Sequence, residues 1–306
     1  MLPSVSPHAL SFPRRVSVEV TNYCNQRCAA CPRQGFRRPL GFIDEELFER
    51  LMRECAHNGS TVWLHFLGEP LLHPHLLELI AAAKAAGVTS VGMSTNAVSL
   101  HGRLAERLCD SGLDRLECSM DADDRKGYLA ARGRDHFERV RANVIAFLEL
   151  KRRLGRERPI VSIQYLRTEA VREHLAQIVE GWRPLLGEQD FVMTIEPASF
   201  AGAVDVPPRG AGAERTPCHW LFESVVVLQD GTVTMCGADW DAESPLGSLR
   251  DHTLKQLWQG EELARRRALH LAGRFTELHP CATCEDWRLA DGSGYRNVSG
   301  APAEQR

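Results

Sequence analysis

Short apolar runs alternate with amphipathic stretches of helical period over the first two-thirds of the chain, and this alternation strongly constrains the fold. The apolar runs predict six strands, at residues 16–20, 62–67, 90–94, 115–119, 160–166 and 191–196. Helical patterns lie between them, and Asp44 occupies the N-cap position of the first. Such alternation predicts parallel βαβ units, and six strands rather than eight predict a partial, open (β/α)6 barrel of the TIM type. We expect its chemistry at the carboxyl ends of the strands.

Changes in amino-acid composition and pattern divide the chain into five predicted segments. These are an N-terminal extension (1–13), the α/β barrel (14–200), a linker (201–214), a small C-terminal domain (215–290) and a flexible tail (291–306). The linker is predicted because glycine and proline cluster there. The small domain is expected to contain a β-hairpin that turns at Asp230-Gly231, followed by a helix at residues 261–271. The tail is polar and contains glycine, which is typical of disordered ends.

Composition narrows the classes of partner and the compartment. A formal net charge of −3 gives no electrostatic reason to expect nucleic acid or an anionic membrane as a partner. No run approaches the ~20 apolar residues that span a bilayer, and residues 1–15 hold three prolines but no signal-peptide stretch. We therefore expect a cytoplasmic protein. In that reducing compartment, closely spaced members of the ten cysteines are expected to be metal ligands rather than disulfides.

Cys24, Cys28 and Cys31 lie within eight residues, directly after the first predicted strand. A tight loop can direct three such thiolates at three irons of a cubane cluster, and thiolates are the usual ligands of iron–sulfur centres. The fourth iron then stays open to a small molecule. The alternative is a zinc loop, which needs a fourth protein ligand. The spacing alone leaves both possibilities open.

A second group of cysteines, Cys218, Cys236, Cys281 and Cys284, follows the predicted linker. Cys218 precedes the predicted hairpin, Cys236 follows its second strand, and Cys281 and Cys284 form a C-x2-C pair. Four thiols gathered in this way form a closed site. Zinc and a [4Fe–4S] cluster satisfy this geometry equally well.

The first group and its surroundings resemble the radical SAM superfamily. In that family a C-x3-C-x2-C triplet follows the first strand of a partial barrel and holds a [4Fe–4S] cluster that cleaves S-adenosylmethionine (SAM). Further segments resemble family motifs, one at the end of each successive predicted strand: Gly68-Glu69-Pro70, Ser94-Thr95-Asn96 and Ser119-Met120-Asp121. Each match is weak alone, but their ordered recurrence is specific.

The resemblance implies which residues bind SAM. Its amino group would be bound by Gly68, Glu69 and Pro70, where an acidic side chain pairs with an ammonium group. Its ribose and carboxylate would be bound by Ser94, Asn96, Ser119, Asp121 and, as a weaker candidate, Gln164. Many relatives carry an aromatic residue before the third cysteine, where it packs on the adenine, but this chain has Ala30 there. We expect Phe36 or Leu166 to pack on the adenine instead.

The second group resembles the SPASM/twitch branch of the same superfamily. Only four cysteines are present, so the resemblance favours the shorter twitch version with one fully ligated auxiliary [4Fe–4S] cluster. The gaps between them resemble those of the aminoglycoside and aminocyclitol oxidoreductases of this branch that are like 2-deoxy-scyllo-inosamine dehydrogenase. The resemblance implies two clusters, SAM, and an electron donor of the flavodoxin or ferredoxin type.

The reaction implied is oxidation of a secondary alcohol in natural-product (antibiotic) biosynthesis. A 5′-deoxyadenosyl radical would abstract hydrogen from a carbinol carbon of an aminoglycoside, aminocyclitol or sugar. The ketone would form on loss of a proton and of a second electron, which the auxiliary cluster would accept. Candidates for the proton acceptor are His65, Arg167, Glu196 and Asp239, although each of them could equally be a structural polar residue.

Three alternatives stay open at this point. A cavity thiol that returned hydrogen to the substrate would make the chain an epimerase, but we expect Cys55, Cys109 and Cys118 to be packed in the core, which favours dehydrogenation. A peptide-maturing enzyme is the second alternative, although no separate leader-binding domain is evident. A non-enzymatic zinc or iron–sulfur protein is the third, and it would cleave no SAM.

Overall fold

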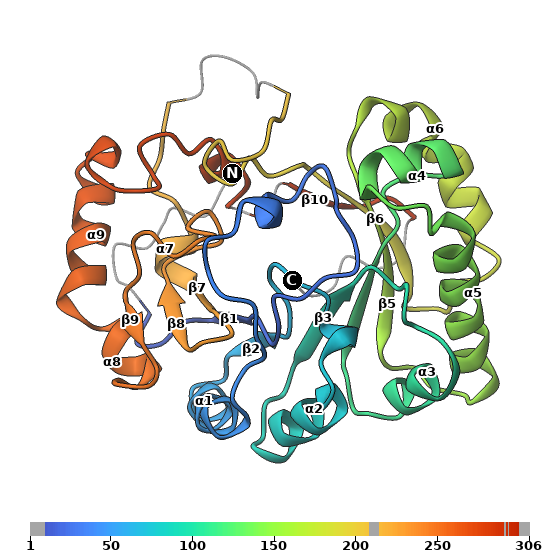
Figure 1. Ribbon diagram of the computed structural model, residues 1–306, viewed down its shortest axis with the longest axis horizontal. Helices are drawn as coiled ribbons and strands as arrows, with labels where there is room; N and C mark the ends of the chain where they lie inside the picture. The colour runs from blue at the N-terminus through green and yellow to red at the C-terminus, as the bar shows by residue number, and fades with distance from the viewer. Residues whose placement is uncertain (1–9, 208–213, 291, 293, 300–306) are drawn as a thin grey trace.

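Six parallel strands form the partial barrel of this protein (Figure 1). The structure is a computed structural model and describes residues 10–207, 214–290, 292 and 294–299. The six strands are β1 (Arg15–Val18), β2 (Thr61–Trp63), β3 (Val91–Thr95), β4 (Arg115–Ser119), β5 (Ile160–Leu166) and β6 (Phe191–Ile195). Each pairs in parallel with the next one along the chain. The α/β fold with a partial TIM-like barrel is therefore confirmed.

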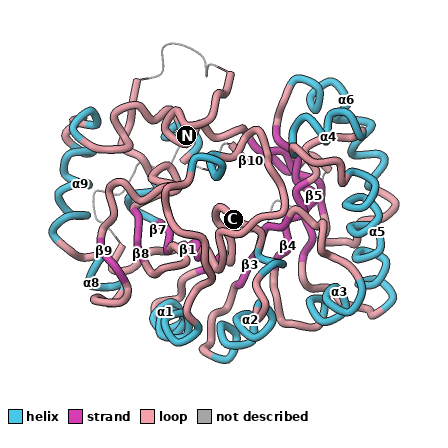
Figure 2. Tube along the Cα trace, in the orientation of Figure 1, coloured by secondary structure: helices cyan, strands magenta, loops and turns pink. Residues whose placement is uncertain are grey.

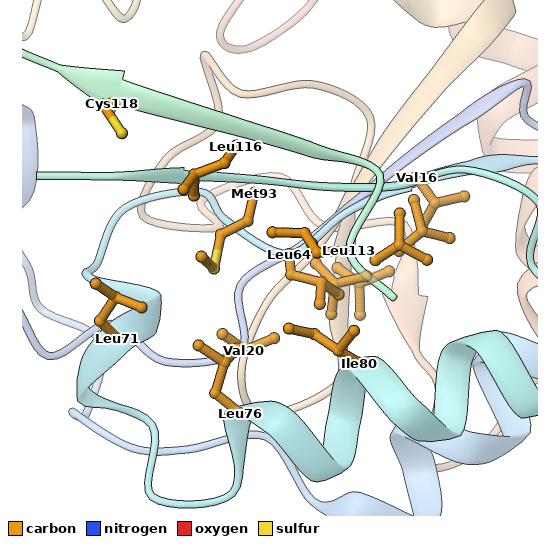
Figure 3. Close-up of a cluster of buried hydrophobic side chains, with 14 of the residues drawn as sticks. Val16, Val20, Leu64, Leu71, Leu76, Ile80, Met93, Leu113, Leu116 and Cys118 are labelled. Atoms are coloured by element: carbon orange, nitrogen blue, oxygen red, sulfur yellow. The ribbon is translucent and has the colours of Figure 1, made fainter. Parts of the chain in front are cut away.

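Helices cover the outer face of the barrel (Figure 2). They are α1 (Glu45–His57), α2 (Leu76–Ala85), α3 (Gly102–Cys109), α4 (Arg125–Arg132), α5 (Phe137–Arg153) and α6 (Glu169–Trp182), with short 3-10 turns η1 (Pro32–Gly35) and η2 (Pro70–Leu72). The Asp44 carboxylate accepts a hydrogen bond from the Leu47 amide, as expected for an N-cap. Alternate strand residues pack against these helices, and Figure 3 shows Leu116 and Cys118 of β4 on the same side of the sheet as Met93. The remaining strand positions face the interior of the barrel.

The C-terminal domain continues the same sheet. Its strands are β7 (Ser224–Val227), β8 (Thr232–Thr234) and β9 (Gly247–Ser248), and its helical elements are α7 (Trp220–Glu223), α8 (Leu254–Trp258), α9 (Glu261–Leu271), η3 (Phe275–Glu277) and η4 (Asp286–Leu289). β7 and β8 form the predicted hairpin, and β7 pairs in parallel with β1. Within the described residues the sheet therefore runs in the order β10-β6-β5-β4-β3-β2-β1-β7-β8-β9. The small domain is an extension of the barrel sheet.

Described residues in the predicted tail and in the predicted N-terminal extension both contact the rest of the protein. β10 (Tyr295–Asn297) lies in the segment predicted as a flexible tail, and it pairs antiparallel with β6. The tail prediction is wrong there. The edge of β6 offers hydrogen-bond partners to the backbone N–H and C=O groups of β10, and no local sequence pattern indicates this pairing. The carbonyl of Leu10, in the predicted extension, accepts a 2.7 Å hydrogen bond from Trp258 Nε1 of α8. Residues 208–213 of the predicted linker lie outside the described residues, as do residues 1–9 and 300–306. No helix of the described residues is long and apolar enough to cross a membrane.

Candidate active site

Polar side chains from four neighbouring strands meet at the carboxyl ends of the barrel strands. The hydroxyls of Ser94 and Ser119 lie 3.5 Å apart, and Gln164 Nε2 donates to the Ser119 hydroxyl at 3.4 Å. His65, just past β2, joins this row because its Nδ1 accepts a 3.1 Å hydrogen bond from the Ser94 amide. The structure thus brings together three residues that the sequence placed at separate strand ends, and adds His65 to them.

Gly68 and Glu69 are held close to the ends of β1 and β3. A Cβ atom on Gly68 would lie 2.0 Å from the Thr21 carbonyl oxygen, so only glycine fits there. The buried Glu69 carboxylate accepts hydrogen bonds from the Thr95 hydroxyl at 2.7 Å, the Asn96 amide at 2.7 Å and the Leu71 amide at 3.0 Å. Burial raises the pKa of Glu69, and these hydrogen bonds oppose that shift. Glu69 therefore joins the end of β3 to the η2 turn that follows β2, besides its proposed contact with SAM.

Asn96 connects the end of β3 to the loop that carries the first cysteine group. Its Nδ2 donates to Asn25 Oδ1 at 2.7 Å and lies 3.8 Å from Cys24 Sγ. The Val98 amide donates to Asn96 Oδ1 at 3.0 Å, which fixes the orientation of the side chain. Asn96 thus positions the first cysteine of the triplet.

The loop with Cys24, Cys28 and Cys31 is fastened to α4. The amides of Arg27 and Ala29 donate to the carbonyls of Arg132 and Ala131 at 3.1 and 2.9 Å. Gly133 ends α4 with a φ of 70°, and a Cβ atom there would lie 2.3 Å from the Arg27 carbonyl oxygen. The close approach of the loop to α4 therefore depends on this glycine. In Figure 1 this blue loop, between β1 and α1, runs around the middle of the view.

Arg132 is a candidate site residue that the sequence did not single out. It is buried, its Nη2 lies 2.8 Å from Asp121 Oδ2, and its Nη1 donates to Cys28 Sγ at 3.5 Å. Its Nε has no hydrogen-bond partner among the described residues. Asp121 is fixed in turn, because its Oδ1 accepts a 2.9 Å hydrogen bond from the Leu166 amide. A buried cation beside the cysteine triplet fits the carboxylate of SAM. The signal in the sequence was Arg132-Gly133, a basic residue before a helix-ending glycine, in a helix that was not predicted.

The second group of cysteines is buried in the C-terminal domain. Cys218, Cys236, Cys281 and Cys284 each interact electrostatically with others of the group, so the four thiols lie together. Burial raises the pKa of Cys218 to about 12 and that of Cys281 to about 11. In the first group, burial raises the pKa of Cys31 to about 11 and also raises that of Cys24. Buried thiols of this kind become thiolates when a cationic metal centre compensates the charge.

The number of thiols in each group bears on the zinc alternative. Structural zinc is held by four protein ligands, and the first group offers only three thiols. A [4Fe–4S] cluster is held by Cys thiolates, and an iron without a protein ligand stays open to a small molecule. The first group therefore fits an open [4Fe–4S] cluster, and the four thiols of the second group fit a fully ligated one.

An aromatic contact joins the segment that follows Cys31 to the segment that follows Cys236. Phe36, five residues after Cys31, stacks on Trp240, and the Arg38 guanidinium lies 4.4 Å from the Phe36 ring centroid. Arg38 also forms a buried bidentate ion pair with Glu19, at 2.8 and 3.0 Å. Because Trp240 and Arg38 already pack on the Phe36 ring, this residue fits the adenine poorly. Leu166 remains the better candidate for that contact.

The four proton-acceptor candidates are in different situations. Arg167 and Glu196 follow β5 and β6 and form an ion pair of 2.5 Å at the carboxyl ends of the strands. Asp239 lies elsewhere, and its carboxylate accepts hydrogen bonds from the amides of Glu243 and Ser244 within a turn. Desolvation lowers the pKa of His65 to about 3, and its Nδ1 is already used by Ser94. Glu196 is thus the candidate whose position and chemistry best suit proton acceptance.

Comparison with known proteins agrees with this geometry. Residues 18–161 match the radical SAM superfamily, and residues 218–285 match the SPASM iron–sulfur cluster-binding domain. The chain carries a radical SAM domain followed by a SPASM domain. Domains of these two kinds bind SAM and [4Fe–4S] clusters, so the cofactors expected from the sequence are confirmed.

The relatives of these radical SAM and SPASM domains differ in what they do. A GTP 3′,8-cyclase of Chlorobaculum tepidum is 35% identical over 126 residues, which are 41% of this chain and only 38% of that protein. The structure of BtrN in complex with AdoMet and 2-DOIA has a TM-score of 0.64 at 17% identity, covering 96% of this chain and 97% of that one. Streptococcus suis SuiB bound to precursor peptide SuiA has a TM-score of 0.71 at 16% identity, covering 94% and 72%. At such identities the structures share the fold alone.

Proposed function

We propose that this chain is a radical SAM dehydrogenase that oxidises a secondary alcohol of an aminoglycoside, aminocyclitol or related sugar to a ketone. When bound, SAM and the two clusters supply a 5′-deoxyadenosyl radical and a one-electron acceptor. The substrate carbinol loses a hydrogen atom from carbon to that radical, a proton from its hydroxyl group to the protein, and one electron to the acceptor. A flavodoxin or ferredoxin type of donor would provide the initial electron.

The observation that carries this proposal is the distribution of the ten cysteines. Seven lie in the two proposed ligand groups. The other three are buried in the hydrophobic core: Cys55 on α1, Cys109 on α3, and Cys118 on β4, where Figure 3 shows it on the same side of the sheet as Leu116 and Met93. No thiol outside the two groups is therefore positioned to return a hydrogen atom to a substrate radical inside the barrel. That favours oxidation over epimerisation, and four ligands on the second cluster favour an electron acceptor over a substrate-binding cluster.

The protein residues have separate roles in this scheme. Cys24, Cys28 and Cys31 would hold the first cluster, and the second group of cysteines the auxiliary one. Arg132 and the row of Ser94, Ser119 and Gln164 would orient SAM at the strand ends. Glu196 would accept the hydroxyl proton, with Arg167 holding its carboxylate toward the open end of the barrel.

Glu196→Gln is expected to slow ketone formation about 100-fold, because the amide cannot accept the proton. Cleavage of SAM without substrate turnover should persist, since that step needs no proton acceptor from the protein. The measurement is 5′-deoxyadenosine and ketone formed per enzyme under single-turnover conditions. Glu180→Gln is the matched control, because Glu180 forms an exposed ion pair with Arg183 on α6. Equal effects of the two substitutions would contradict the role given to Glu196.

The decisive experiment is incubation of reduced, reconstituted protein with SAM and candidate aminoglycosides in deuterated water. A product lighter by two hydrogen atoms is expected. An unchanged formula with deuterium gained at carbon would instead identify an epimerase. Release of 5′-deoxyadenosine that responds to none of the sugars would contradict the proposed substrate class.

A peptide substrate is the second candidate, and the fold similarity to SuiB favours it. SuiB was solved with its precursor peptide, and 72% of its chain is matched here. A peptide-modifying enzyme would show a cross-linked or otherwise modified peptide by mass spectrometry. The same assay with peptides encoded beside the gene therefore separates the two candidates.

A further inference from the structure

His270 lies between two of the four cysteines of the second group. It is 1% exposed and sits in the last turn of α9. The Cys218 backbone amide lies 3.3 Å from its Nδ1, and Cys281 Sγ lies 3.3 Å from its Nε2. The Phe275 ring meets the imidazole edge-on at a centroid distance of 5.1 Å and restricts its rotation. The imidazole of His270 therefore contacts two of the proposed cluster ligands, Cys218 through its backbone amide and Cys281 through its sulfur.

The tautomer of this imidazole follows from its contacts. A backbone N–H can only donate, so Nδ1 must accept the hydrogen bond from Cys218. In an imidazole whose Nδ1 accepts, the ring proton is on Nε2. Nε2–H therefore points at Cys281 Sγ and donates to it.

We propose that His270 is a positioning residue that raises the reduction potential of the auxiliary cluster by donating a hydrogen bond to the Cys281 thiolate. This inference rests on the proposed function, in which that cluster accepts the second electron. Hydrogen bonds to the ligand sulfurs are one of the main ways in which a protein sets the potential of a cluster. The donor withdraws charge from the thiolate and so stabilises the reduced state.

The surrounding charges make such a donor useful. The carboxyl groups of Asp286 and Asp239 are both buried close to the second group, near Cys284 and Cys281 respectively, so negative charge is present there in addition to the four thiolates. Arg215 offsets part of it: its Nη2 donates to the Cys281 carbonyl at 2.7 Å, and its guanidinium stacks on Phe275. A more negative environment lowers a reduction potential. Arg215 and His270 counter this at the same cysteine, one by charge and the other by a directed hydrogen bond.

The test separates the two contacts of the imidazole. In His270→Asn the amide oxygen can replace Nδ1 as acceptor for Cys218, but the side chain is too short to reach Cys281. In His270→Gln the amide nitrogen can replace Nε2 as donor. Both are made in full-length protein that carries Cys24→Ala, Cys28→Ala and Cys31→Ala, so that only the auxiliary cluster gives a signal. His252→Asn is the control, because His252 is exposed in the same domain.

The readout is the midpoint potential of the reconstituted cluster, followed by electron paramagnetic resonance. His270→Asn is expected to shift the ratio of reduced to oxidised cluster at least tenfold toward the oxidised state, about 59 mV for one electron. His270→Gln and His252→Asn should match the parent. Equal potentials in parent and His270→Asn, or a shift in His270→Gln as large as in His270→Asn, would overturn the proposal.

A second measurement needs no substitution at His270. With 15N-labelled histidine, the reduced auxiliary cluster should show a weak coupling to one imidazole nitrogen through the Cys281 sulfur. Absence of that coupling would also overturn the proposal. If the parent assembles no auxiliary cluster at all, the proposed function itself fails, and the iron content reports this separately.

Discussion

Replacing Cys218 and Cys236 together with alanine is expected to abolish ketone formation, by more than about 100-fold, while SAM cleavage continues. Both thiols are buried within the second group, and two remaining thiolates cannot close a cubane cluster. The substrate radical then has no acceptor for its second electron. The measurements are iron per chain, which should fall from about eight to about four, and the yields of 5′-deoxyadenosine and ketone.

Cys109→Ala is the matched control for this prediction. Cys109 is also buried, but it lies on α3 outside the barrel and apart from both groups. Its replacement should leave iron content and both products unchanged. Ketone formation that survives loss of the second group would show that the electron leaves the substrate by another route and would contradict the proposed mechanism.

Gly133→Ala is expected to lower the free energy of unfolding by about 3 kcal/mol and to remove the first cluster. An L-residue at the left-handed φ of 70° costs about 1–2 kcal/mol, and the clash with the Arg27 carbonyl adds about 1–3 kcal/mol. The loop must then move away from α4, which displaces Cys28 from its partners. The measurements are denaturant unfolding, iron content and SAM cleavage.

Gly155→Ala is the control that separates the backbone strain of a positive φ from the displacement of the cysteine loop. Gly155 has a φ of 61°, but a Cβ atom there meets nothing within 4 Å. It should cost only the conformational part, about 1–2 kcal/mol, and leave both clusters in place. If Gly133→Ala behaved like Gly155→Ala, the contact between the loop and α4 would not be what positions the first cysteine group.

Local patterns were sufficient to predict most of the barrel. β4 and β5 have the predicted bounds, and α9 spans residues 261–271 as expected, because each element carries its own periodicity. The row of Ser94, Ser119 and Gln164 was also predictable in outline, since parallel strands bring their carboxyl ends to one edge. Features that need only local chemistry or a regular topology were therefore accessible from the sequence.

Features created by contact between distant segments were not accessible. α4 is short and polar, and its importance comes from the carbonyls that it offers to the cysteine loop. The turn whose amides donate to the Asp239 carboxylate is likewise not visible as a sequence pattern. His270 lies eleven residues before Cys281 within an ordinary helical sequence, so only the folded structure reveals its contact with the sulfur.

The parallel pairing of β7 with β1 has a consequence for how the protein is made. β1 lies between β2 and β7, so one edge of β1 stays unpaired until β7, about two hundred residues later in the chain, has been synthesised. Such non-local pairing delays folding. A nascent or truncated chain that ends before β7 would expose this edge and be prone to aggregate. Folding of the barrel is in this sense coupled to synthesis of the C-terminal domain.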